Sequence, residues 1–310
     1  MKPLVLLMIP MAEPYRAAIA EHFELLYAPD AATREAALAS RGDAVRAVLT
    51  NGSLGLRADD LARMPALELV SALGVGYENI ALDAARSRGI VLTNGAGTNA
   101  ACVADHAFAL LLSVVRAVPR FDAACRAGAW RDELPEQPMV AQRRLGIVGL
   151  GHIGREVAKR AAGFDMETGY HSRTRRDGAS SRYFDSLPDL AGWSDFLVIA
   201  TPGGAETHHL VDRAVLDALG PDGYLVNVAR GSVVDTAALA DALRAGTLGG
   251  AALDVYEGEP KPPAALFEFD NVVLTPHVAG TSPQSVAATV RNLIDNASRH
   301  FAGDAVSTPI

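Results

Sequence analysis

The sequence predicts an α/β protein built on parallel β-sheets, and two observations predict this class. Short apolar runs alternate with segments of helical length along most of the 310 residues, and such runs are typical of parallel strands buried on both faces. The composition is 49% hydrophobic, so the chain can form two buried cores. We therefore expect two domains of αβ type.

The first series of predicted strands lies within residues 4–94. Its apolar runs read LVLLMI, AVLT, LELVSAL and GIVLTN. We interpret the first run as a strand with its loop and not as a signal peptide, because prolines flank it and no cleavage pattern follows. These runs predict the parallel sheet of one domain.

A long helix and an arm interrupt this alternation. From Asn99 to about Pro119 the pattern predicts one long buried helix that the proline ends. The prolines in residues 120–144 predict an irregular arm. Such projections often form oligomer contacts, so we expect a homodimer. Cys102 and Cys125 have no disulfide or metal-ligand spacing, and we expect no metal site.

The second series of predicted strands lies within residues 145–276. Its apolar runs read LGIVGL, METGYH, FLVIATP, YLVNVA, GGAALDV and NVVLTP. A final helix is predicted from about Ser282 to Phe301. We expect this helix to return to the first domain.

A glycine fingerprint opens the second series. Gly149, Gly151 and Gly154 have GxGxxG spacing directly after a strand and at the start of an amphipathic helix. In that context Gly149 makes the turn, Gly151 admits a pyrophosphate, and Gly154 allows helix and strand to pack closely. The helix N-terminus attracts the phosphate charge, so we expect this loop, with His152 and Ile153, to bind a dinucleotide. The alternative is an ordinary βα turn.

The next strand ends without the acidic residue that an NAD-specific site normally carries. Ser172 stands 18 residues after Gly154, where that acid would bind the adenosine ribose. Ser172, Arg173 and Thr174 offer two hydroxyls and a guanidinium, which suit the 2′-phosphate of NADP. We therefore expect NADPH to be preferred over NADH. The alternative is a solvated basic loop.

Three late strands end in polar residues, where parallel sheets carry their sites. These residues are Arg230, Asp254, Glu259 and His277. Each has an ordinary structural interpretation alone, as a surface charge, a loop cap or a structural histidine. His106, on the long apolar helix, is predicted to be such a structural core residue.

Motifs distributed over nearly the whole chain resemble those of one family. In order they read ALGVGYENIALDAARSRGIVLTN, VADHAFALLL, GIVGLGHIGREVA, SDFLVIATPGGAETHHL, LVNVARGSVVDTAALADAL, AALDVYEGEP and VVLTPHVAG. The chain resembles the D-isomer-specific 2-hydroxyacid dehydrogenases and is most similar to their glyoxylate/hydroxypyruvate reductases. The resemblance implies two Rossmann-like or flavodoxin-like domains with parallel sheets. A nucleotide domain, residues 99–281, would be inserted into a substrate domain, residues 1–98 plus 282–310.

The resemblance also implies that Arg230, Glu259 and His277 form the catalytic set. Reduction of a 2-keto acid needs a hydride, a proton for the carbonyl oxygen and a cation for the carboxylate. Protonated His277 would donate the proton as general acid, and Glu259 would orient the imidazole and favour its protonated form. Arg230 would hold the carboxylate and polarise the carbonyl group.

Further contacts with substrate and cofactor follow from the same resemblance. The backbone N–H groups of Val75 and Gly76 would hold the substrate carboxylate, together with Arg230 and His277. Asp254 would hydrogen-bond the nicotinamide carboxamide. The residues expected to line the cofactor are Thr201, Pro202 and Val228.

Departures from other branches of the family narrow the expected substrate. The segment NGSLG after Thr50 lacks the arginines with which phosphoglycerate dehydrogenases hold a phosphate. Glu259 stands where formate dehydrogenases have glutamine. We assign no substrate role to Trp130 and expect it to pack in the core or at an interface.

We therefore expect NADPH-dependent reduction of glyoxylate or hydroxypyruvate to the D-2-hydroxy acid. Two alternatives stay open within the fold, a 2-ketogluconate reductase and an aryl-pyruvate reductase, because residues 51–56 are small and permissive. A third alternative is a cofactor-sensing binding protein, since some relatives act as transcriptional corepressors.

Charge and hydropathy narrow the expected partners. The formal net charge is −8 and no lysine-rich stripe is present, so we expect no nucleic-acid partner. No apolar run approaches the roughly 18 residues that cross a bilayer. We expect a cytoplasmic protein without a membrane anchor.

Overall fold

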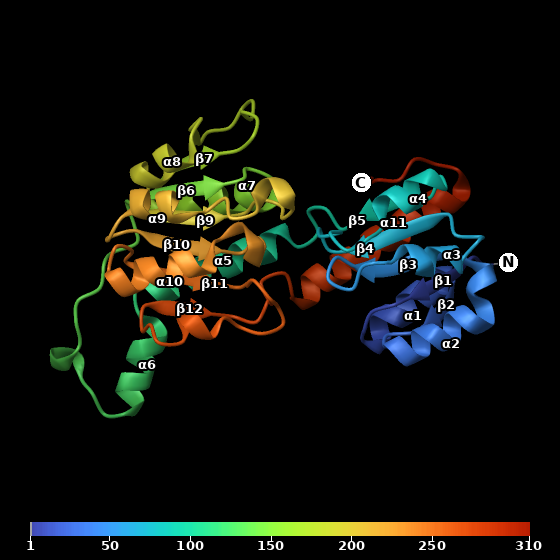
Figure 1. Ribbon diagram of the computed structural model, residues 1–310, viewed down its shortest axis with the longest axis horizontal. Helices are drawn as coiled ribbons and strands as arrows, with labels where there is room; N and C mark the ends of the chain where they lie inside the picture. The colour runs from blue at the N-terminus through green and yellow to red at the C-terminus, as the bar shows by residue number, and fades with distance from the viewer. Residues whose placement is uncertain (1) are drawn as a thin grey trace. The chain divides into compact units, whose positions relative to one another are not determined.

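The computed structural model describes residues 2–310, which divide into two compact units (Figure 1). The first unit runs to Asn99 and includes Thr281–Ile310; the second is Ala100–Gly280. Each boundary lies one residue from the one predicted. Both units are αβ structures with parallel sheets, so the predicted fold class is confirmed.

The first unit contains a five-stranded parallel sheet with strand order β2-β1-β3-β4-β5. Its strands are β1 (Leu4–Leu7), β2 (Glu24–Tyr27), β3 (Val45–Asn51), β4 (Leu69–Leu73) and β5 (Val91–Asn94). Strand β2 was not predicted, and it is a short edge strand without a fully buried residue. An edge strand needs less apolar sequence than a central strand, so its signal is weak.

Five α-helices belong to this unit. They are α1 (Glu13–His22), α2 (Ala31–Arg41), α3 (Ala58–Ala62), α4 (Leu82–Ser87) and α11 (Pro283–Ala302). Ser282 caps α11 by accepting a hydrogen bond from the backbone N–H of Ser285 at 3.1 Å. Val290 and Leu293 of α11 are buried in one core cluster with Val5 and Leu69. The final helix therefore returns to the first unit, as predicted.

The second unit contains a seven-stranded parallel sheet with strand order β12-β11-β10-β9-β6-β7-β8. Its strands are β6 (Arg144–Val148), β7 (Glu167–His171), β8 (Arg182–Tyr183), β9 (Phe196–Ile199), β10 (Tyr224–Asn227), β11 (Gly250–Leu253) and β12 (Val272–Leu274). The strand order reverses at β6, which lies between β9 and β7. Doubly wound sheets bind ligands outside the carboxyl ends of the strands at such a reversal.

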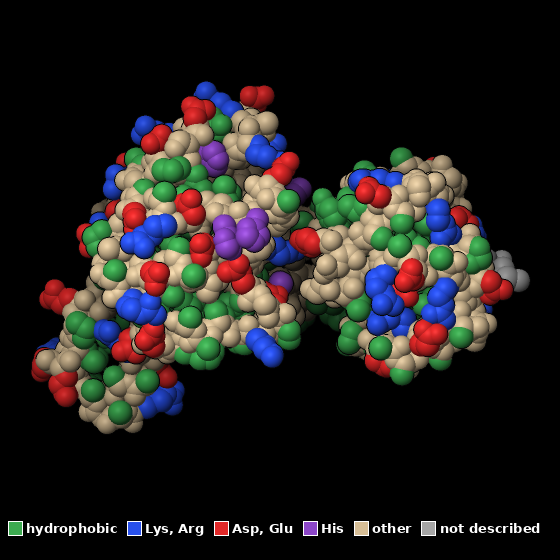
Figure 2. All heavy atoms as spheres, viewed as in Figure 1, with side chains coloured by type: hydrophobic (Ala, Val, Ile, Leu, Met, Phe, Trp, Pro, Cys, Tyr) green, Lys and Arg blue, Asp and Glu red, His purple; other side chains and the backbone are tan. Residues whose placement is uncertain are grey.

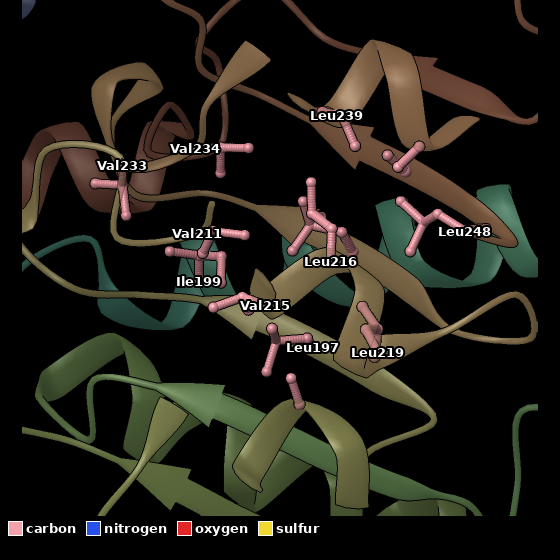
Figure 3. Packing of buried hydrophobic residues seen from close by; sticks show 14 of the residues in the cluster. Leu197, Ile199, Val211, Val215, Leu216, Leu219, Val233, Val234, Leu239 and Leu248 are labelled. Atoms are coloured by element: carbon pink, nitrogen blue, oxygen red, sulfur yellow. The ribbon is translucent and has the colours of Figure 1, made fainter. Parts of the chain in front are cut away.

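Helices cover both faces of this sheet. They are α5 (Ala100–Val115), α7 (His152–Ala161), α8 (Leu187–Trp193), α9 (Arg213–Leu219) and α10 (Thr236–Ala245). Helix α6 (Val118–Arg126) follows α5, buries no residue and projects away from the sheet. Figure 3 shows part of the core on one face, where Leu216 of α9 and Leu239 of α10 pack with Leu197 of β9. On the other face, α5 and α7 pack over the opposite sides of the strands. Burial on both faces explains the nearly continuous apolar strand sequences.

The prediction of one long helix from Asn99 to Pro119 is wrong in one respect. Helix α5 ends at Val115, and a second helix, α6, begins at Val118. Ala117 between them has a left-handed backbone, with φ of 49°, and Pro119 lies in the first turn of α6. Proline has no N–H to leave unpaired there, so it favours a helix start. Residues 120–126, predicted as irregular, are therefore helical.

Trp130 lies 66% exposed after α6, so the alternative that it packs in the core is wrong. Its packing at an interface stays a prediction.

Among residues 2–310, no single helix is both long and apolar enough to cross a bilayer. Helices α5 and α6 pass that test only as a pair, across a bend of 58°.

Candidate active site

The predicted cofactor and catalytic residues of the second unit all follow strands at one edge of its sheet. The loops after β6, β7, β9, β10, β11 and β12 carry them, together with the first turn of α7. Because all these strands are parallel, their carboxyl ends lie at the same edge. The residues are Gly149, Gly151, His152, Ile153, Gly154, Ser172, Arg173, Thr174, Thr201, Pro202, Val228, Arg230, Asp254, Glu259 and His277.

The glycine loop between β6 and α7 has the geometry of a dinucleotide loop. Gly149 has φ of +94°, which side chains rarely allow, and a Cβ there would lie 2.9 Å from the Ala200 carbonyl oxygen. A Cβ on Gly154 would overlap the carbonyl oxygen of Gly149. The loop therefore turns tightly and packs against the start of its own helix.

The same loop leaves room for an anion. A Cβ on Gly151 would meet no atom within 4 Å, and no side chain caps α7. The three later helices of the sheet are instead capped by Ser186, Asp212 and Asp235. The first N–H groups of α7 are thus not occupied by a capping side chain, which fits binding of a pyrophosphate there.

The loop after β7 presents the groups predicted to face the ribose. The Ser172 hydroxyl donates to the Thr174 carbonyl oxygen at 2.7 Å, which folds the loop on itself. Arg173 Nη1 lies 2.5 Å from Oε2 of Glu206, and the two side chains are 83% and 75% exposed. Sequence reasoning missed Glu206, because it lies in the distant loop after β9.

The loop after β9 also contains Thr201 and Pro202. The Thr207 hydroxyl donates to the Pro202 carbonyl oxygen at 2.9 Å and so closes this loop. Val228, which follows β10, is buried. Its N–H donates to the Ile199 carbonyl oxygen at 3.3 Å. These residues border the glycine loop through Ala200, whose N–H donates to Val148 at 2.9 Å.

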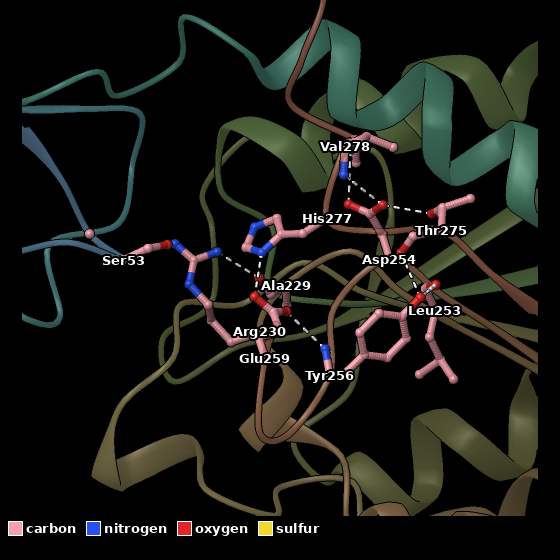
Figure 4. Close-up of polar contacts among 12 residues, drawn as sticks. Ser53, Ala229, Arg230, Leu253, Asp254, Tyr256, Glu259, Thr275, His277 and Val278 are labelled. Atoms are coloured by element: carbon pink, nitrogen blue, oxygen red, sulfur yellow. Dashed lines mark hydrogen bonds and ion pairs between the residues drawn. The ribbon is translucent and has the colours of Figure 1, made fainter. Parts of the chain in front are cut away.

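His277 and Glu259 form a hydrogen-bonded pair. His277 Nδ1 lies 2.7 Å from Oε2 of Glu259, and Oε1 of that carboxylate accepts from the Tyr256 N–H at 2.9 Å. Figure 4 shows Arg230 extending into the same region as this pair. The carboxylate is held from its own loop, so it can fix the orientation of the imidazole.

Asp254 organises the loop that carries His277 (Figure 4). Its carboxylate is 1% exposed. Oδ1 accepts from the Thr275 hydroxyl at 2.6 Å and the Val278 N–H at 2.9 Å, and Oδ2 accepts from the Ala279 N–H at 2.9 Å. These bonds support the left-handed backbone of His277, whose φ is 53°. The nicotinamide contact of Asp254 stays a prediction.

Two aromatic side chains add to this support. The Tyr256 hydroxyl donates to the Thr275 carbonyl oxygen at 2.5 Å, and burial, with the nearby Asp254 charge, raises the pKa of Tyr256 to about 12. The phenol is therefore neutral at physiological pH and remains a donor. His106 of α5 is 23% exposed and lies 2.9 Å from the Thr275 hydroxyl.

Arg230 is presented by a buried loop after β10. Asn227 is fully buried, and its amide donates to the Arg230 carbonyl oxygen at 3.1 Å. Arg230 Nη1 donates to the Ala229 carbonyl oxygen at 2.7 Å. Gly203 lets the loop after β9 approach, since a Cβ there would lie 2.8 Å from Arg230 Cγ. The arginine backbone and stem are therefore fixed.

Val75 and Gly76 belong to the first unit, in the loop after β4. The Asn94 amide donates to the Val75 carbonyl oxygen at 2.9 Å. A Cβ on Gly52 would lie 2.6 Å from the backbone of Gly76. This loop is thus tied to its neighbours within the first unit, and its substrate role stays a prediction.

The sequence matches a family model described as D-isomer specific 2-hydroxyacid dehydrogenase, NAD binding domain, over residues 108–279. It is 38% identical to a glyoxylate/hydroxypyruvate reductase A of Arabidopsis thaliana, covering 99% of this chain and 98% of that protein. It is also 38% identical to a hydroxyphenylpyruvate reductase of Plectranthus scutellarioides, again covering 99% and 98%.

The fold matches solved structures over its full length. One is an NADPH-dependent glyoxylate/hydroxypyruvate reductase from Sinorhizobium meliloti in complex with NADP and malonate. The TM-score is 0.90 and the sequences are 36% identical, over 100% of this chain and 97% of the other.

Proposed function

The chain belongs to the D-isomer specific 2-hydroxyacid dehydrogenase family, and we propose that it reduces glyoxylate or hydroxypyruvate to the D-2-hydroxy acid with NADPH. It is a pyridine-nucleotide oxidoreductase of that family. The relatives and the neighbouring structure named above include reductases of these two acids. Within this proposal the second unit binds the cofactor and the first unit is the substrate domain.

The observation that carries the proposal is the His277–Glu259 pair beside Arg230. The Nδ1–Oε2 distance of 2.7 Å commits Nδ1 to the carboxylate, so Nε2 is the ring atom that can meet a substrate. A guanidinium nearby suits a 2-keto acid, whose carboxylate and carbonyl oxygens accept hydrogen bonds side by side.

The chemistry divides between cofactor and protein. A bound nicotinamide supplies the hydride that is added to the carbonyl carbon. His277 donates its Nε2 proton to the carbonyl oxygen, and Glu259 stabilises the protonated imidazole before that transfer. Arg230 holds the substrate carboxylate and stabilises negative charge on the carbonyl oxygen. The N–H groups of Val75 and Gly76 are proposed to bind the same carboxylate.

We propose NADPH as the preferred cofactor because of the loop after β7. Ser172, Arg173 and Thr174 place no carboxylate there, and the guanidinium is 83% exposed. The Arg173–Glu206 ion pair must break before a 2′-phosphate can bind the guanidinium. Exposed pairs of this kind contribute only about 0–1 kcal/mol, so the phosphate can displace the glutamate.

Replacing Arg173 by alanine is expected to raise the Kd of NADPH at least about 10-fold and to leave the Kd of NADH nearly unchanged. Charge-assisted hydrogen bonds to a phosphate contribute about 1.5–3 kcal/mol each, and NADH has no 2′-phosphate. Fluorescence titration of both cofactors measures the effect. Arg244→Ala is the matched control, because Arg244 is also exposed and pairs with Glu268 at 2.8 Å. Equal efficiency of the unmutated enzyme with both cofactors would contradict the preference.

An aryl-pyruvate reductase is the second candidate. The observation that favours it is the hydroxyphenylpyruvate reductase, which is as similar to this chain as the glyoxylate/hydroxypyruvate reductase is. Rates with glyoxylate, hydroxypyruvate, 2-ketogluconate and phenylpyruvate, each with NADPH and NADH, separate the candidates. If kcat/KM is highest with phenylpyruvate, the proposal that glyoxylate or hydroxypyruvate is the substrate is contradicted.

We also propose that the enzyme is a cytoplasmic homodimer. Val118, Trp130 and Met139, at and after the start of α6, are 52%, 66% and 55% exposed. Large exposed apolar side chains are typical of surfaces covered by a second subunit. Sedimentation equilibrium tests the proposal, and a monomer at micromolar concentration would contradict it.

A further inference from the structure

We infer that the ion pair between His209 and Glu257 is a positioning device for the catalytic loops. It fastens the loop that carries Glu259 to the loops that follow β9 and β10. The inference rests on the proposed roles of Glu259 and His277. Neither His209 nor Glu257 belongs to the catalytic or cofactor sets described above.

Glu257 lies at the meeting point of three loops. Its Oε1 lies 2.7 Å from His209 Nε2, in the loop after β9. Its Oε2 accepts from the Thr236 N–H at 3.1 Å, at the start of α10. Glu257 itself follows β11. One carboxylate thus joins the loops of three adjacent strands.

His209 is fastened at its backbone as well as its ring. Its N–H donates to the Ser232 carbonyl oxygen at 2.8 Å, close to Arg230. Its φ is 51°, a conformation that costs a non-glycine residue of order 1 kcal/mol or more. Glycine would take this backbone without strain, so the position is explained by what the imidazole contacts.

The carboxylates around His209 favour its protonated form. The hydrogen bond to Glu257 raises the pKa of His209. Burial alone would raise the pKa of Glu257, but hydrogen bonds from Thr236 and His209 outweigh burial and lower it. The other groups that face His209 are Asp235, whose Oδ2 lies 3.8 Å from Nδ1, and His208, whose ring stacks at 4.0 Å.

The pair acts on the catalytic residues through a short piece of chain. Glu257 is two residues from Glu259, and the residue before it, Tyr256, donates the backbone N–H that holds Glu259 Oε1 at 2.9 Å. Tyr256 is fixed on the opposite side by its hydroxyl bond to Thr275. Removing the pair would leave this loop held at one end, so Glu259 would be less well placed against His277.

A metal site is the competing interpretation. Ligand atoms of His208, His209 and Glu257 lie within 4.8 Å of one another, and Figure 2 shows histidine side chains gathered beside acidic ones on the second unit. However, the two rings are stacked with only 28° between their planes. Metal ligands donate in the ring plane, and nearly parallel rings do not direct both nitrogens to one ion. His209 is also already bonded to Glu257.

The test compares His209→Gln and Glu257→Gln with His208→Gln as the matched control. We expect kcat to fall about 10-fold in the first two variants, as misplacement of a catalytic group does. The KM for NADPH should change little, and the double variant should lose no more than either single variant.

A second readout does not depend on activity. The downfield proton resonance of His277 Nδ1 reports its hydrogen bond to Glu259 and should weaken in both variants but not in His208→Gln. Unchanged kcat and an unchanged resonance would overturn the positioning role. So would a fall in melting temperature with the resonance intact, which indicates a structural role only. Loss of activity in His208→Gln that zinc restores would favour the metal site.

The two proposals fail in different ways. If the unmutated enzyme reduces none of the keto acids, the proposed function fails, while the resonance still tests the positioning role. If the unmutated enzyme is active and the variants match it, only the positioning role fails.

Discussion

Replacing His277 by alanine is expected to lower kcat at least about 100-fold while leaving the Kd of NADPH nearly unchanged. General acids contribute about 10²–10⁴-fold to turnover, and the imidazole is held 2.7 Å from Glu259 at the edge of the sheet that carries the other candidate-site residues. The loop itself is fixed by Asp254 through the N–H groups of Val278 and Ala279. The variant should therefore keep its fold and lose the proton donor.

Pre-steady-state hydride transfer and cofactor titration together measure this effect. His22→Ala is the control, because His22 is an exposed histidine at the end of α1. Near-normal turnover in His277→Ala would remove His277 from the role of general acid.

The sequence predicted the central strands well and the edges poorly. Strands such as β9 and β10 are buried on both faces, so nearly every residue is apolar and the pattern is unmistakable. Strand β2 has no fully buried residue and β8 has only two residues, so neither needs an apolar sequence. The break at Ala117 depends on a left-handed residue that is not glycine, which composition does not reveal.

The positions of the candidate-site residues were predictable where these residues lie directly after a strand. Gly149, Arg230 and His277 follow apolar strands in this way, and strand ends at one edge of a parallel sheet are necessarily neighbours. Contacts between loops were not predictable. Arg173 and Glu206 are 33 residues apart, and His209 and Glu257 are 48 apart. Their pairing depends on strand order, which periodicity does not give.

The contacts between loops also decide how the site is supported. Asp254 acts within the loop that it organises, whereas Glu257 connects separate loops. One more backbone segment, the one that follows Arg230, lies close to Glu257. At that point two backbone segments of the chain touch without any side chain between them.

Gly231 is the residue at this crossing, directly after Arg230. A Cβ built on it would overlap the carbonyl group of Tyr256 and the backbone nitrogen of Glu257. Backbone atoms have no rotamer by which to move aside, so the two loops would have to separate. Separation would displace Arg230 on one side and the segment that holds Glu259 on the other.

Gly231→Ala is therefore expected to destabilise the second unit by about 3 kcal/mol, the upper range for overpacking. At about 2–4 °C per kcal/mol for a unit of this size, the melting temperature should fall by roughly 10 °C. Scanning calorimetry measures the change in melting temperature. At 25 °C the kcat per folded molecule should also fall. Gly163→Ala is the control, because a Cβ there meets no atom within 4 Å. If Gly231→Ala matched that control in melting temperature and kcat, the close contact between the loops would not be needed for either stability or catalysis.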